Sequence, residues 1–225
     1  MNAALDHLVV AAATLDEGVA WCTATLGVAP GPGGEHPLFG THNRLLRLQG
    51  AEAAYLEIIA INPATCPTRP APLKRWFDLD DPALQARLSG HGPQLIHWVA
   101  RVSDIDSARR AWLAQGIDPG PVLAASRETP QGLLQWRITV PDDGGRGFDG
   151  VLPTLIQWGA QHPTDTMAPG GPHLTGLTLS HPQMDRLRQA LGAIGLGHIA
   201  VREDAPALNA ELSLGDRTVH CQSLA

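Results

Sequence analysis

The hexapeptide LDHLVV at residues 5–10 returns twice along the chain in altered form. Residues 95–100 read LIHWVA and residues 174–179 read LTGLTL, and each copy is an apolar run typical of a buried strand. The first two copies carry His7 and His97 at the third position, whereas the third copy has Gly176 there. Since the repeated strand tolerates glycine at this place, the two imidazoles require a separate explanation.

Each copy is followed by a helical pattern that ends at a glycine. In the first, Thr14 and Glu17 have the spacing of a capping box, and Gly27 suits the position just past the helix. Extended segments separated by turn residues come after each helix. We therefore predict an α+β fold built from βαβββ modules, with helices outside a strongly curved mixed sheet and a cavity inside it.

The module boundaries follow from this repeat. We expect the first module at residues 3–62 and the second at 93–160, separated by a linker at 63–92 that holds a short helix near 81–90. Together they predict one domain over residues 1–160. A third, degenerate βαβββ module is expected at 173–225, where it flanks the cavity or supports a homodimer.

The composition excludes several classes of function. The chain has 225 residues, of which 44% are hydrophobic and 17% charged, as in an ordinary globular protein. A formal net charge of -6 without a basic run argues against nucleic-acid partners and anionic membranes. No apolar run is long enough to span a bilayer, no secretion signal is visible, and the three cysteines form no CxxC pair. These features predict a soluble cytoplasmic protein.

Strand alternation places the repeated histidines on a common face. His7 shares one face with Leu5 and Val9, while Leu8 and Val10 form the apolar face that a helix would cover. By the same rule His97 looks away from the helices. Both imidazoles should therefore face the space enclosed by the sheet.

The closing strands of the two modules carry a second polar pair. Glu57 stands alone among apolar residues in AYLEIIAI, and Gln157 occupies the matching place in LPTLIQW. A buried carboxylate needs a cation, a metal or strong donors. With His7 and His97 they offer nitrogen and oxygen donors for Zn, Ni, Mn or Fe(II).

A plainer interpretation exists for each residue alone. One histidine in a strand is more often a hydrogen-bonded core or surface residue, and one glutamate is more often at a solvated edge. The joint occurrence at repeat-equivalent positions favours the metal site.

The paired modules resemble the vicinal oxygen chelate superfamily, which includes glyoxalase I, methylmalonyl-CoA epimerase, extradiol dioxygenases and metal-free bleomycin-binding proteins. GGEHPLFGTHNRLLRL at residues 33–48, followed by AYLEIIAINP at 54–63, is similar to the bacterial glyoxalase-like domain family, in which a GGxHPxxGTxN stretch joins the first helix to YLE. The resemblance implies metal ligands at His7, Glu57, His97 and Gln157. The fourth ligand is a glutamate in many of the superfamily's metal enzymes, so Gln157 is a departure that leaves Glu57 as the one carboxylate base.

The same stretch supplies candidate substrate-binding residues. His36, Thr41 and Asn43 are placed to line the rim of the cavity and orient a substrate oxygen, although Thr41 and Asn43 would equally satisfy backbone groups in a turn.

Two functions follow from these features. The first is a small-molecule enzyme that depends on a divalent metal, as a lyase, isomerase or Fe(II) dioxygenase. The second is a metal-free protein that binds or sequesters a small molecule, which Gln157 favours and Glu57 opposes.

Overall fold

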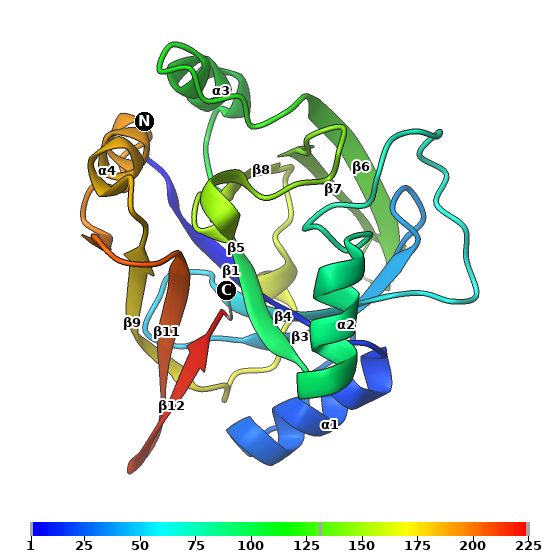
Figure 1. The fold of residues 1–225 in the computed structure, drawn as a ribbon. Coiled ribbons are helices and arrows are strands. Elements are labelled where there is room, and N and C mark those ends of the chain that lie inside the picture. The colour runs from blue at the N-terminus through cyan, green and yellow to red at the C-terminus, as the bar shows by residue number, and fades with distance from the viewer. Residues whose placement is uncertain (1, 131, 224–225) are drawn as a thin grey trace.

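Figure 1 shows the computed structural model of the chain, which describes residues 2–130 and 132–223. The first module comprises β1 (Ala4–Ala11), α1 (Leu15–Leu26), β2 (Glu35–His36), β3 (Thr41–Arg47) and β4 (Tyr55–Ile61). The second comprises β5 (Gln94–Arg101), α3 (Ile105–Leu113), β6 (Val122–Thr129), β7 (Gly132–Thr139) and β8 (Thr154–Trp158). The third comprises β9 (His173–Ser180), α4 (Met184–Ala193), β10 (Ala200–Arg202), β11 (Ala207–Leu214) and β12 (Arg217–Gln222). All three predicted βαβββ units are present, and the α+β fold is confirmed.

The connecting segments add shorter elements. The linker between the first two modules holds α2 (Pro82–His91), close to the predicted short helix. Two single-turn helices, η1 (Gly147–Gly150) and η2 (Pro163–Asp165), precede and follow β8. In the described part of the chain, no helix has the length and apolar character needed to cross a membrane.

The first two modules form one curved sheet of eight strands in the order β2-β3-β4-β1-β5-β8-β7-β6. Strand β1 pairs antiparallel with β5 at the centre, and each of them pairs in parallel with the last strand of its own module, β4 or β8. The third module forms a separate sheet in the order β10-β9-β11-β12. The centre of the large sheet is therefore where the two histidine-bearing strands meet.

The local sequence fixes both ends of α1 as expected. The Thr14 hydroxyl accepts a hydrogen bond from the Glu17 N–H, and Gly27 takes a left-handed conformation with φ 70° past the end of α1. In the second module, the Asp104 side chain accepts from the Ser107 N–H and begins α3. These caps satisfy backbone groups that the helix itself leaves unpaired.

The two faces of the large sheet pack differently. Leu8 and Val10 lie in an outer core with α1 and α3, as alternation predicts, whereas Val9 and Val99 lie in a second core on the concave face. The concave core also receives α2 and the aromatic residues of the linker. The linker therefore closes the cup that the sheet forms.

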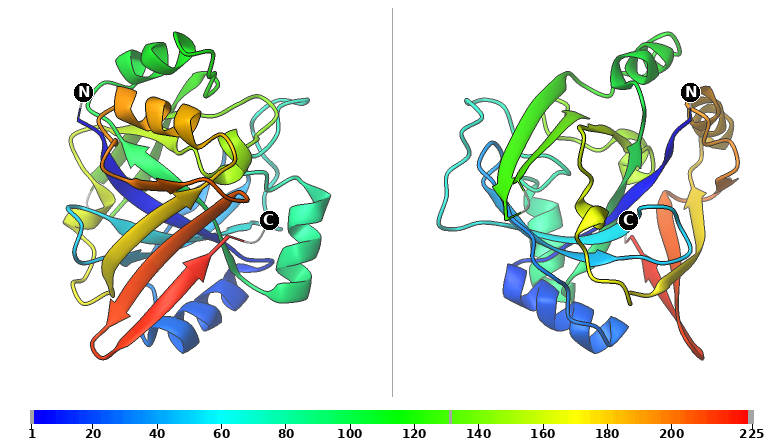
Figure 2. Two further views of the ribbon diagram at one scale, coloured as in Figure 1. Left: turned by 60° about the vertical axis from the view of Figure 1, so that its left-hand side comes forward. Right: turned by 180° about the vertical axis from the view of Figure 1, so that it is seen from behind.

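The third module packs on the outer face and shares its core. Leu208 and Leu212 of β11 lie in one apolar cluster with Leu8, and the Trp112 indole N–H of α3 donates to the Ala190 carbonyl of α4 at 2.8 Å. Figures 1 and 2 show the small sheet beside the large one, with α3 and α4 adjacent at one end of the molecule. Its place is against the convex side, away from the cavity.

Candidate functional site

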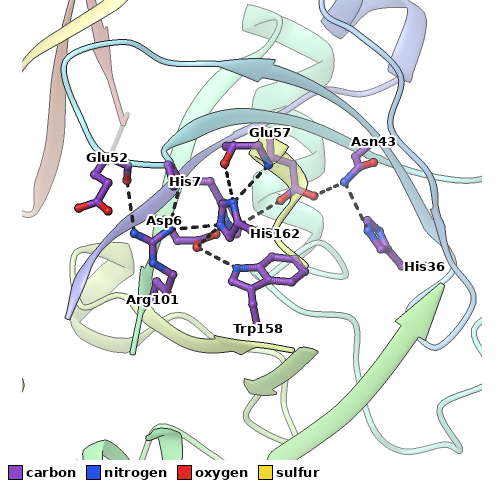
Figure 3. A network of polar contacts seen from close by, with 11 residues as sticks. Asp6, His7, His36, Asn43, Glu52, Glu57, Arg101, Trp158 and His162 are labelled. Carbon is purple, nitrogen blue, oxygen red and sulfur yellow. Dashed lines mark hydrogen bonds and ion pairs between the residues drawn. The ribbon is translucent and has the colours of Figure 1, made fainter. Parts of the chain in front are cut away.

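An irregularity in β1 brings two adjacent polar residues together. Leu5 pairs with Ala100 and His7 with Val99, so Asp6 is an extra residue opposite β5. Such a bulge breaks the alternation of side chains and turns a residue toward a new face. As a result Asp6 and His7 meet on the concave side, where the Asp6 Oδ1 atom lies 2.7 Å from Nδ1 of His7 (Figure 3).

His7 lies between two carboxylates. Its Nδ1 atom contacts Asp6, and its Nε2 atom lies 3.5 Å from Oε2 of Glu57 on β4. Burial opposes protonation, but the hydrogen bond to Asp6 and the nearby Glu57 carboxylate outweigh it and raise the pKa of His7 to about 9. At neutral pH His7 is therefore an imidazolium that donates from both ring nitrogens.

Asp6 is an ionised anchor at the back of the site. Burial opposes its charge, yet hydrogen bonds from His162 and His7 hold the pKa of its carboxyl well below the usual range. Its Oδ2 atom accepts from the Trp158 indole at 2.9 Å and lies 3.0 Å from Nε2 of His162. Because His162 Nδ1 accepts from the Thr164 N–H, its Nε2 atom carries the hydrogen that Asp6 accepts.

Glu57 has a second partner on β3. The Asn43 side-chain N–H donates to Oε1 of Glu57 at 2.6 Å. Burial raises the pKa of Glu57, but the bond from His7 and the charge of His7 overcome it, so the net shift is downward. Glu57 is therefore an ionised carboxylate that is 4% exposed and is held on one side by a cation and on the other by an amide.

His36 belongs to the same chain of contacts but is neutral. Burial lowers its pKa to about 4. Its Nε2 atom lies 3.4 Å from the Asn43 amide nitrogen, and its Nδ1 atom lies 3.0 Å from the Thr41 hydroxyl. With Asn43 donating, Nε2 of His36 accepts and its Nδ1 donates to Thr41. Thus His36 and Asn43 line the cavity, while Thr41 orients His36 from behind.

The glycines of residues 33–43 are needed for close packing around Asn43. The Gly34 N–H donates to the Asn43 side-chain oxygen at 2.8 Å, which fixes the amide with its NH₂ toward Glu57. A Cβ atom on Gly33 would lie 2.0 Å from the Asn43 carbonyl oxygen, and one on Gly34 would lie 2.2 Å from the Arg127 guanidinium. The glycines of residues 33–43 therefore leave room for Arg127 of β6 to lie at the edge of the site.

These groups surround a small inner cavity of about 30 Å³. His7, Glu57, His36, Asn43 and Arg127 form its polar side, and its other walls are apolar or aromatic. The aromatic lining residues are Tyr55, Trp76, Phe77, Trp136 and Trp158. Trp76 and Phe77 come from the linker, which sequence reasoning did not connect with the cavity.

An outer groove of about 500 Å³ continues from this cavity. Leu45, Arg127, Leu134 and Pro163 line both spaces. The far wall of the groove is the segment 161–171, which leads from the second module to the third. That segment is held across the sheet by Arg47, whose guanidinium donates to the Thr164 carbonyl at 2.8 Å.

The structure does not bring all four predicted metal ligands together. Nδ1 of His97 lies 2.9 Å from the Gly150 carbonyl, and its Nε2 accepts from the Thr154 N–H at 3.2 Å, so both ring nitrogens have protein partners. Gln157 lies on the outer face, where its side-chain oxygen accepts from the Ile105 N–H at the start of α3. Gln157 was expected beside Glu57. Instead, its side chain caps the N-terminus of α3.

Strand register explains this correction. Glu57 pairs with Val9 in the first module, and Thr154 pairs with Val99 in the second, so Thr154 is the counterpart of Glu57. The Thr154 hydroxyl lies 3.0 Å from His97 Nε2, in the place that Glu57 has beside His7. The second copy of the site is thus an uncharged pair, and burial lowers the pKa of His97 to about 3.

The four predicted ligands provide no common site for a divalent metal. Within residues 2–130 and 132–223, no three His, Cys, Asp or Glu side chains converge in a way that could hold an ion. His97 is engaged on both nitrogens, Gln157 faces outward, and the lone pairs of Glu57 face an imidazolium and an amide. The predicted set does not fit a metal centre in this arrangement.

Besides Trp76 and Phe77, sequence reasoning missed three polar residues of the site, Asp6, Arg127 and His162. Asp6 stands in the same hexapeptide as His7, but alternation assigns it to the opposite face, and only the bulge reverses that. Its signal was a carboxylate within an apolar strand. Arg127 and His162 carry no local signal, because each reaches the site from a distant segment.

The curved sheet of paired βαβββ modules is that of a glyoxalase-like fold. The model of the glyoxalase-like domain family matches residues 5–195, and the chain belongs to that family. None of the curated proteins compared with the chain matches it.

Solved structures show how far the fold is shared. A hypothetical protein from Staphylococcus aureus is 12% identical with a TM-score of 0.59, and the match covers 98% of this chain and 85% of that one. Its coverage extends the common fold through the third module. Methylmalonyl-CoA epimerase from Mycobacterium tuberculosis is 20% identical with a TM-score of 0.39, covering 69% of this chain and 86% of the epimerase.

Proposed function

We propose that this protein is an enzyme that moves a proton at a carbon next to a carbonyl group of a small organic substrate. Glu57 is the base and His7 is the hydrogen-bond donor to the carbonyl oxygen. The observation that carries the proposal is the 3.5 Å separation between His7 Nε2 and Glu57 Oε2, both of which face the inner cavity.

The separation matters because it is longer than an ordinary hydrogen bond between an imidazolium and a carboxylate. A carbonyl oxygen that enters between the two groups can take over the His7 N–H. Glu57 then loses its cationic donor, and its pKa rises toward that of a more effective base. Substrate binding would thereby activate the base.

The proposed step conserves atoms and charge. The Glu57 carboxylate takes the proton from the carbon, the electron pair of that bond moves into the carbonyl, and His7 stabilises the resulting oxyanion. Protonation of the same carbon by water from its other face, with release of the Glu57 proton to water, gives an epimer, and return of the Glu57 proton to a different atom gives an isomer. Departure of a leaving group from the neighbouring carbon gives a lyase reaction.

Proton exchange into solvent tests the step without knowledge of the natural substrate. We would incubate the protein in D₂O with 2-oxohexanoate and follow loss of the proton signal at the third carbon by NMR. The wild type should catalyse exchange, and Glu57→Gln should lower its rate by at least about a hundredfold. Equal exchange in both proteins, or none above the uncatalysed rate in the wild type, would contradict the proposal.

A metal-dependent lyase, isomerase or dioxygenase is the competing enzyme. It would require His97 to release Thr154 or Gly150, or a ligand set different from the predicted one. Metal content of protein purified without chelator distinguishes the two, with a His7→Ala, His97→Ala double variant beside it. One equivalent of metal in the wild type that is lost in the double variant would favour the metal enzyme.

Metal-free binding or sequestration is the second candidate function. It is favoured by the full complement of protein partners on Glu57 and by the aromatic walls of the cavity. A binding protein would hold the same ligands without exchanging their protons. Saturable binding with no exchange would support it over the enzyme.

A further inference from the structure

We infer that Arg127 is an anion-binding residue at the junction of the inner cavity and the outer groove, and that the substrate is an organic acid. The inference rests on the proposed function and names its substrate class. In this arrangement the reacting carbon enters the inner cavity, the acid group pairs with Arg127, and the rest of the molecule lies in the groove.

The first observation is the position of Arg127. It lines both the inner cavity and the outer groove, so any molecule that extends from one into the other passes its guanidinium. The inner cavity, at about 30 Å³, has room for only the reacting atoms of a substrate, whereas the groove, at about 500 Å³, can hold a larger body. The bulk of the molecule therefore lies on the outer side of Arg127.

The second observation is that no carboxylate of the described residues forms an ion pair with the positive charge of Arg127. Its one described polar contact is from Nη1 to the Asn43 side-chain oxygen, at the long distance of 3.5 Å. Within the described residues, no carboxylate lies within ion-pair distance of it. Burial lowers its pKa, so the guanidinium is partly removed from water without receiving a full partner. Such a group gains strongly from a bidentate anion.

The third observation is that the backbone makes room for this side chain. Gly34 has no Cβ atom, and one built there would lie 2.2 Å from Nη1 of Arg127 and 2.9 Å from its central carbon. Glycine at this position thus allows the guanidinium to lie close to the backbone. Asn43 connects the two functions, because its oxygen faces Arg127 and its NH₂ group donates to Glu57.

The outer groove fits the remainder of an apolar acid. Met167, Ala168 and Pro169 line its far wall, with Val28 and Pro130 elsewhere in it. Among the residues that the structure describes, Asp165 carries the one carboxylate that lines the groove, and it accepts a hydrogen bond from the His162 backbone N–H at 2.8 Å. Arg47 is the other cation in the lining. The balance of charge therefore favours an anion over a cation.

A structural alternative is that Arg127 merely offsets the charges of Glu57 and Asp6. In that case its removal would weaken the fold but would not change which ligands bind. The experiment must therefore compare a charged ligand with a neutral one of the same shape.

We would measure binding by calorimetry with 2-oxohexanoate, 2-oxooctanoate and the methyl esters of both. The wild type should bind each acid at least about tenfold more tightly than its ester, the range expected for a hydrogen-bonded charge. Arg127→Gln should remove that preference and leave ester binding unchanged. Arg202→Gln, which removes the same charge from an exposed position on β10, is the matched control and should behave as the wild type.

Two further variants test whether the preference for the acid depends on the position of the Arg127 guanidinium and whether it is independent of the base. Gly34→Ala keeps the charge but displaces the guanidinium, and it should weaken acid binding more than ester binding. Glu57→Gln should keep the preference for the acid while losing proton exchange, so a failed base assignment leaves the anion site testable. Acid and ester bound equally, a preference that survives Arg127→Gln, or no saturable binding of any acid would each overturn the inference.

Discussion

Asp6 and His7 are neighbours in sequence, and their side chains meet on the same side of β1 at 2.7 Å. In a regular strand they would point to opposite faces. The bulge at Asp6 makes the contact possible, and the contact keeps His7 protonated in a buried place. The charge state of the whole site therefore depends on one extra residue in one strand.

Asp6→Asn should lower the stability of the protein and the pKa of His7 together. Removing one partner of a buried charge pair costs about 3–5 kcal/mol, because the remaining charges lose their compensation. Urea unfolding gives the stability, and NMR titration of the His7 ring gives the pKa. Asp16→Asn, on the exposed first turn of α1, is a control with the same change of charge. A His7 pKa that stays near 9 in Asp6→Asn would contradict this assignment.

Stability should fall as the pH rises above neutrality. The pKa of His7 is raised from 6.5 to about 9 in the folded state, so the folded chain binds a proton that the unfolded chain releases first. This contribution is complete below pH 6.5 and is lost as the pH approaches 9. The loss is at most about 1.4 kcal/mol per pH unit for one proton. Unfolding free energies at pH 6.5, 7.5 and 9 measure it, and a slope unchanged in His7→Asn would refute its origin.

Stability should also fall as the pH drops below 6.5. His36 and His97 are buried with their pKa values lowered to about 4 and about 3, so the unfolded chain takes up protons before the folded chain does. Each contributes a loss of at most about 1.4 kcal/mol per unit between pH 6.5 and its folded pKa. His97→Gln should reduce the slope of unfolding free energy against pH in this range. The same slope in both proteins would show that His97 is not a buried neutral base.

Gln157→Ala should affect the helix and not the chemistry. Its oxygen accepts from the Ile105 N–H at the start of α3, and loss of such a cap costs about 1 kcal/mol. Gln157→Glu keeps the acceptor and adds a favourable charge at a helix N-terminus. Both variants should retain wild-type proton exchange and ligand binding. Loss of either function together with loss of bound metal would restore Gln157 as a ligand.

The repeat and the module order could be predicted because they follow from local rules. Apolar runs, caps and glycine stops recur at fixed spacing, and each of these is decided within a few residues of chain. The position of the linker in space, inside the cup, could not be predicted in the same way. Trp76 and Phe77 enter the cup because the sheet leaves an apolar end to cover, which is a property of the assembled fold.

The residues of the candidate site also divide into those that local sequence indicates and those that only the assembled fold brings together. His7, Glu57, His36 and Asn43 could be proposed from the sequence, because polar residues within apolar strands and a glycine-rich connection are visible in one dimension. Gln157 lies three positions beyond Thr154, and an odd offset along a strand reverses the face of a side chain. In the second module the true counterpart of Glu57 is Thr154.

The amino-acid order thus settled which strands carry polar side chains and how often the unit repeats. The tertiary structure settled which of those side chains meet. A bulge turned Asp6 inward, the pairing of Val99 with Thr154 placed Gln157 on the outer face, and Arg127 and His162 reach the site from segments more than a hundred positions from His7. Contacts of that kind depend on how strands pair and curve in space, and no local pattern along the chain specifies them.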